Sequence, residues 1–104
     1  MADYKFPRVP RRGDPNAALV VQKNIEDLMQ KALADDDKNW YPPTKPRTDD
    51  PLKHMVVWEN LQSIVHPILG ETASPFYFPY VVRRDDKNAA VILQKNLEHF
   101  VRSL

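Results

Sequence analysis

The stretch FYFPYVVRRDDKNAAVILQKNLEHFVRSL, residues 76–104, repeats YKFPRVPRRGDPNAALVVQKNIEDLMQKA, residues 4–32, at an offset of 72 positions. Thirteen of the 29 aligned pairs are identical. Self-similarity at a fixed period is typical of repeat proteins, in which one unit cannot bury its hydrophobic face alone. The sequence therefore predicts a fold assembled from copies of one unit.

Half of that offset, 36 positions, reveals a weaker middle copy at residues 40–68. Four polar or proline positions recur in all three copies: Pro7, Pro43, Pro79; Arg11, Arg47, Arg83; Asp14, Asp50, Asp86; and Asn24, Asn60, Asn96. We expect a single domain, 1–104, built from three repeats at 4–39, 40–75 and 76–104. An asparagine beside an apolar seam usually fixes helix register, and we expect this role for the asparagine series.

Composition narrows the class of protein. The chain has 104 residues, no cysteine and a formal net charge of +1 with 28% charged residues. A disulfide framework and a thiolate metal site are excluded, and the mixed surface gives no broad attraction to nucleic acid. No apolar run approaches the roughly 20 residues of a membrane span, so we expect no membrane segment and no signal peptide.

Helix signals recur once per unit. Asp14-Pro15 and Asp50-Pro51 are typical helix starts, because the carboxylate caps free N–H groups and a proline at the first position has none to lose. Apolar residues then follow at spacings of three and four, as in the series that begins at Ala18, which predicts amphipathic helices. We expect the first helix to end near Leu33 and the second by His66, since Pro67 blocks continuation.

The predicted fold class is all-α, with three helices in 36-residue repeats and extended proline-rich arms. The connector at residues 34–50 is long for a bundle, but a polyproline path of about 3.1 Å per residue can return to the starting end. The helices could then lie parallel around a pseudo-threefold axis. An up-down-up bundle is the alternative, and the equality of the repeats favours the parallel form.

Two groups of side chains are candidates for partner binding. Arg11, Arg47 and Arg83 could pair with cap aspartates of neighbouring units or grip a carboxylate-bearing partner. The aromatic candidates are Trp40, Tyr41, Phe76, Tyr77, Phe78 and Tyr80. We expect most of these rings to cover the core, and the dense cluster at residues 76–80 to leave an exposed anchor for another protein.

Enzymatic chemistry finds no support in the motifs. With two glycines there is no phosphate-binding loop, and the three histidines have no metal-ligand spacing. We therefore expect no enzyme, no catalytic residue, no cofactor and no metal.

The unit from Pro7 to Met29, a proline and arginine arm followed by Asp-Pro and an amphipathic helix, resembles short segments near the N-termini of tailed-bacteriophage tail and fibre proteins. The resemblance implies a virion protein, made in the host cytoplasm, that docks onto other virion proteins in a trimeric or symmetric assembly. One chain would supply all three arms of a pseudo-trimer, as a tail, fibre or capsid adaptor. The alternative is a small regulatory protein that binds nucleic acid through Arg8, Arg11, Arg12, Arg83 and Arg84.

Overall fold

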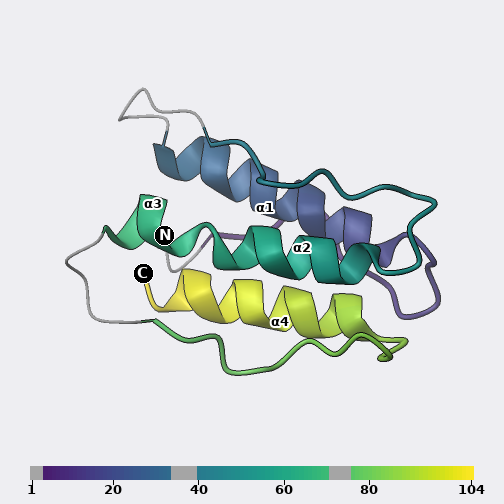
Figure 1. Ribbon diagram of the computed structural model, residues 1–104. Coiled ribbons are helices and arrows are strands. Elements are labelled where there is room, and N and C mark those ends of the chain that lie inside the picture. Colours follow the sequence, from purple (N-terminus) through teal and green to yellow (C-terminus); the bar gives the residue numbers. More distant parts are fainter. Residues whose placement is uncertain (1–3, 34–39, 71–75) are drawn as a thin grey trace.

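The computed structural model describes residues 4–33, 40–70 and 76–104. These residues form the helices α1 (Ala17–Leu33), α2 (Lys53–Gln62), α3 (Val65–Leu69) and α4 (Ala89–Arg102), shown in Figure 1. No strand occurs within the described ranges, so the all-α prediction is confirmed for them. The expected repeat boundaries at residues 39 and 75 lie outside the described residues.

The same turn leads into α1, α2 and α4. The Oδ1 atoms of Asp14, Asp50 and Asp86 accept hydrogen bonds from the backbone N–H two residues later, at 2.9, 2.9 and 2.8 Å. Each helix begins three residues after its aspartate. The aspartate thus closes a turn before the helix, a local bond typical of Asp at turn positions. Pro15 and Pro51 lie in this turn and not at the first helical position, as had been predicted.

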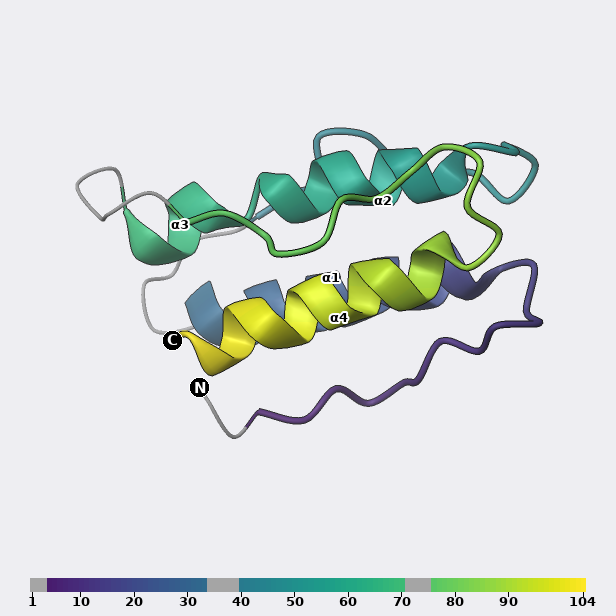
Figure 2. The ribbon, with the colours of Figure 1, turned by 90° about the horizontal axis from the view of Figure 1, so that it is seen from below.

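The three long helices α1, α2 and α4 start at one end of the molecule and run in the same direction (Figure 1). Each contacts the other two. An extended arm precedes each helix and runs back along the outside of the bundle in the opposite direction (Figures 1 and 2). The radius of gyration, 13.2 Å, is close to the ~13 Å of a compact domain of this length.

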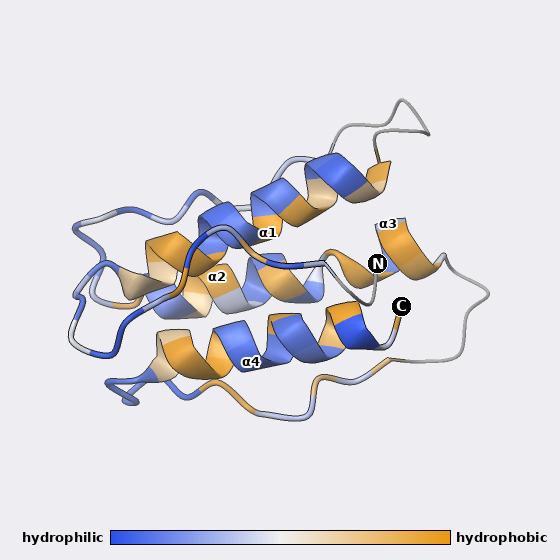
Figure 3. Ribbon diagram, turned by 180° about the vertical axis from the view of Figure 1, so that it is seen from behind, coloured by the Kyte–Doolittle hydropathy of each residue, from blue (hydrophilic) through white to orange (hydrophobic). Residues whose placement is uncertain are grey.

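The core consists of three layers, each with one side chain from every unit. All nine side chains are fully buried: Val21, Val57, Leu93; Ile25, Leu61, Leu97; and Leu28, Ile64, Phe100. Within each unit they follow at spacings of four and three, so the predicted apolar spacing is confirmed. Figure 3 shows apolar and polar residues alternating around each helix, as expected for helices that bury one face.

The second helix differs from the expectation, because it stops at Gln62 and a further turn, α3, contains Pro67. The N–H of Ser63 is shared between the carbonyls three and four residues earlier, and its Oγ donates to the carbonyl of Asn60 at 2.6 Å. The hydrogen bonding of the helix therefore changes before the proline, with bonds that span three residues beside those that span four. Pro67 falls in the first turn of α3, where a missing N–H costs little. Gly70, with φ of 81°, ends this helix.

Truncation of the middle core layer tests the packing. We expect Leu61→Ala to lower the free energy of unfolding by about 2–5 kcal/mol, because the removed atoms leave a cavity between three helices. Urea denaturation followed by circular dichroism measures this loss. The adjacent exposed residue provides the control, and Gln62→Ala should change stability by no more than about 0.5 kcal/mol. Equal denaturation midpoints for the two variants would contradict the assigned core.

Candidate functional site

Two fully buried asparagines hold the second and third arms by their backbones. Asn96 donates from Nδ2 to the carbonyl of Tyr80 at 2.8 Å and accepts the N–H of Tyr80 on Oδ1 at 3.0 Å. Asn60 makes the same pair of bonds to Thr44, at 2.7 and 3.3 Å. A side-chain amide carries one acceptor and two donors, so it can pair with a peptide group much as a neighbouring strand would. Each arm is thereby fixed in position.

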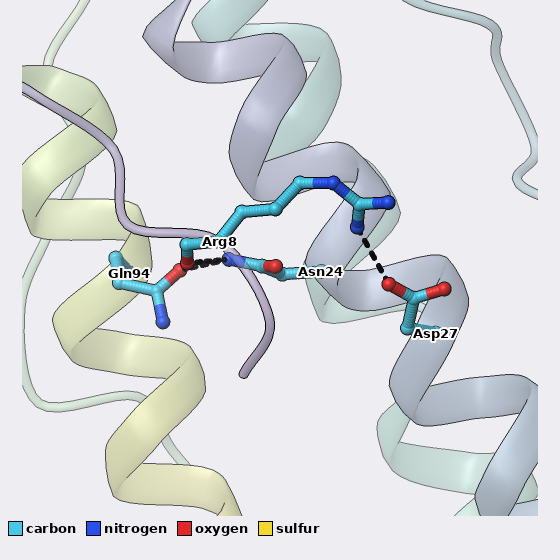
Figure 4. A network of polar contacts seen from close by, with 4 residues as sticks. All are labelled: Arg8, Asn24, Asp27 and Gln94. Atoms are coloured by element: carbon cyan, nitrogen blue, oxygen red, sulfur yellow. Dashed lines mark hydrogen bonds and ion pairs between the residues drawn. The ribbon is translucent and has the colours of Figure 1, made fainter. Parts of the chain in front are cut away.

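The first arm is held by a related contact (Figure 4). Asn24 donates from Nδ2 to the carbonyl of Arg8 at 2.9 Å and to Oε1 of Gln94 at 3.0 Å. Its buried Oδ1 has no partner within the described residues. The Arg8 guanidinium instead reaches Asp27 on α1 at 2.6 Å. This arm is therefore fixed by one backbone bond and one partly exposed ion pair.

Glutamine side chains link the helices through the same asparagines. Gln22 accepts from Asn60 at 2.9 Å, as Gln94 accepts from Asn24. The corresponding position of α2, at the 36-residue offset, is Trp58. The repeated asparagines predicted a role in fixing register, whereas the contacts of the glutamines and of this tryptophan were not predicted. The signal was present, since an aromatic residue replaces a polar one at a repeated position.

The predicted aromatic residues divide into two groups. The inward group packs on the core and consists of Trp40, Phe76 and Phe78. The ring of Phe76 lies edge-on to that of Phe100, with centroids 5.1 Å apart, and Phe78 lies 5.6 Å from Trp58. These contacts make Phe76 and Phe78 part of the cover of the bundle.

The outward group leaves large side chains in solvent. Tyr41, Tyr77 and Tyr80 are 77%, 81% and 48% exposed, and their neighbour Val81 is 76% exposed. Three of these four residues lie on the third arm. The buried asparagine Asn96 holds this arm at Tyr80. The arm therefore presents apolar surface from a fixed backbone.

The arginines behave differently from the structural expectation. Arg11, Arg47 and Arg83 are exposed, and the backbone carbonyl of each accepts the N–H of the aspartate three residues later. Within the described residues, the ion pair of this series joins Arg47 to Asp49 of the same unit at 3.5 Å. Because both side chains are 77% exposed, this pair contributes little. Pairing between units is not found among the described residues.

A cavity of about 290 Å³ opens where α1, α2 and α4 begin. Its charged lining comprises Arg11, Arg12, Lys53, Arg84 and Lys87, with Asp14, Asp85 and Asp86. Arg47 and Arg83 lie outside this lining. The predicted arginine series is therefore not gathered at a single site.

The start of the first arm rests on α1 and α4. Burial raises the pKa of the Tyr4 phenol above its ordinary value, the Asp27 carboxylate raises it further, and the Arg8 guanidinium opposes them. The Lys31 ammonium lies 5.4 Å from the centre of the Tyr4 ring. Such a cation over an aromatic face stabilises the contact.

Among the described residues, no group of three His, Asp or Glu side chains could hold a metal ion. None of the described helices has both the length and the apolar character needed to cross a membrane. In comparisons with protein-family models, curated proteins and solved structures, nothing matches this chain.

Loss of one asparagine tests how the third arm is fixed. We expect Asn96→Ala to lower the free energy of unfolding by about 1–3 kcal/mol, because it leaves the Tyr80 peptide group without its buried partner. Amide hydrogen exchange at Tyr80 should become faster. The exposed neighbour Lys95 supplies the control, and Lys95→Ala should leave this exchange unchanged. Slow exchange at Tyr80 in the Asn96 variant would show that other contacts hold the arm.

Proposed function

We propose that this protein is a non-enzymatic structural adaptor that docks onto other subunits of a phage particle through its third arm. The observation that carries the proposal is the outward presentation of Tyr77, Tyr80 and Val81 from an arm fixed by Asn96. Tyrosine supplies a large amphipathic contact area with few rotatable bonds, and such residues are enriched among those that dominate binding energy.

Fixation of the arm favours docking for an entropic reason. A flexible segment loses conformational freedom when it binds, at a cost of about 0.5–1.5 kcal/mol for each rotamer-rich side chain that is immobilised. The backbone of the third arm is already ordered by Asn96, and Phe76 and Phe78 anchor it on the core. Less freedom remains to be lost when a partner covers its outer side.

We also propose that the three units form a pseudo-threefold bundle. In support, each buried asparagine bonds to the backbone of the residue sixteen positions earlier. The three core layers draw one side chain from each unit. A symmetric frame would then carry unlike outer surfaces, because Arg8, Thr44 and Tyr80 occupy the same repeat position.

The phage setting comes from the resemblance of Pro7 to Met29 to segments of tail and fibre proteins. A tail, fibre or capsid accessory role is consistent with a small unit that fixes three arms on one bundle. Location in the virion and a trimeric or otherwise symmetric partner are parts of this proposal.

Affinity purification tests the adaptor role. The tagged chain, recovered from infected cells with nuclease treatment, should retain a few virion proteins in fixed proportion. Joint replacement by Tyr77→Ser and Tyr80→Ser should weaken this binding by at least about 2 kcal/mol, or roughly thirtyfold. The exposed α1 residue Gln30 provides a control, because Gln30→Ser should retain the partners. Equal retention by the double variant would contradict docking through the third arm.

A second candidate function is nucleic-acid binding at the cavity where the helices begin. The observation in its favour is that Arg11, Arg12 and Arg84 line one cavity with two lysines. The three aspartates in the same lining reduce its attraction for phosphate. Salt discriminates between the two functions, because affinity carried by phosphate contacts falls steeply as ionic strength rises. Loss of all partners after nuclease treatment would favour this second function.

A further inference from the structure

A second cavity, of about 360 Å³, lies between the first arm and α4. Its apolar lining includes Tyr4, Phe6, Pro10 and Val101, and Gln94 also lines it. We call this cavity the arm 1 groove. Its volume lies within the roughly 300–1,000 Å³ of typical ligand pockets.

The corresponding place beside the third arm is filled by the chain itself. There the ring of Trp58, on α2, packs against Phe78 with centroids 5.6 Å apart. The repeat offsets align Phe78 with Phe6, and Trp58 with Gln94. Thus the two grooves share a phenylalanine on the arm and differ in the residue that the helix supplies. A glutamine leaves open the space that a tryptophan occupies.

Two further wall positions support the comparison. Pro10 and Val82 occupy the same repeat position and are both buried. Val101 on α4 corresponds to Val65, the first residue of α3, which packs against the core. The walls of the arm 1 groove are therefore apolar at the positions where the filled groove is apolar.

We propose that the arm 1 groove binds a tryptophan side chain from an acidic segment of a partner protein. This proposal rests on the proposed docking function and adds a second contact to it. The aromatic anchor would occupy the space that Trp58 takes in the filled groove. Apolar walls favour burial of such a ring, and the buried area of one aromatic side chain dominates small interfaces.

The charge on the rim identifies the flanking residues of the partner. Lys5, Arg8 and Arg102 line the groove, and Glu98 is the acidic residue in the lining. Arg8 is paired with Asp27, and Arg102 lies 3.8 Å from Glu98. After these pairings the rim retains a positive charge at Lys5. Acidic residues on each side of the anchor would therefore be attracted, and basic residues repelled.

A short peptide tests the groove directly. The probe is a blocked pentapeptide with tryptophan at its centre and two acidic residues on each side, titrated into the isotope-labelled full chain. We expect amide chemical-shift changes at Phe6, Gln94 and Val101. The same peptide with lysines in place of the acidic residues should bind at least about threefold more weakly. Shift changes that avoid these residues, or equal binding of the two peptides, would overturn the proposal.

Filling the groove provides the matched variant. Gln94→Trp should lower the peptide affinity at least about tenfold, because the new ring occupies the site as Trp58 does in the filled groove. Gln62→Trp adds the same ring at an exposed position of α2 outside the groove lining and should bind as the unmodified chain does. Unchanged affinity in the Gln94 variant would refute the site.

The fold should tolerate this change. Asn96 holds its arm with no glutamine partner in the described residues, and the bond from Asn24 to the carbonyl of Arg8 does not pass through Gln94. Circular dichroism checks the fold.

If Gln94→Trp does not fold, the joint change Lys5→Glu and Arg102→Glu replaces two exposed rim cations. That variant should prefer the lysine-flanked peptide, and an unchanged preference would overturn the proposal.

The outcomes separate the groove from the docking function. If virion partners bind the chain but the acidic peptide does not reach Phe6 and Val101, the adaptor role stands and the groove is refuted. If the peptide binds in the groove but the nuclease-treated chain retains no partner, the groove stands and the adaptor role is refuted.

Discussion

The hydrogen bonds between the buried asparagines and the arms are the constraint on which the rest of the structure depends. A side-chain amide among fully buried apolar layers is costly unless its donors and acceptor are satisfied. Asn60 and Asn96 meet this requirement with the peptide groups of Thr44 and Tyr80. The arm is therefore part of the folded core, because removing it would leave a buried polar group without a partner.

This constraint also explains the direction of the helices. Each asparagine pairs with an arm that precedes its own helix by a fixed distance in sequence, so each arm must run along the outside of the bundle. Each arm leads the chain to the same end of the bundle, and the three long helices therefore start together there (Figures 1 and 2). Proline-rich segments suit this path, since they are stiff and extended without internal hydrogen bonds.

The sequence was informative wherever the repeat made three positions equivalent. The apolar spacing predicted that each helix buries one face, and Asp14 and Asp50 predicted helix starts to within three residues. The arm residues that bond to the asparagines could not be predicted from the sequence, because these bonds go to backbone groups and the backbone is the same at every residue. The break at Ser63 was missed for a similar reason, since a local change of hydrogen bonding leaves no composition signal.

The candidate site depends on the differences between units, which a search for repeats sets aside. Aromatic content predicted the third arm as a place for exposed anchors, but only packing separates Phe78, held against Trp58, from Tyr77 in solvent. The positions that form the core must stay alike, because three side chains share each layer. Residues on the outer side of the arms do not pack in these layers, so they can differ between arms without changing the core. A bundle with one shared core can thus present different surfaces on its three arms.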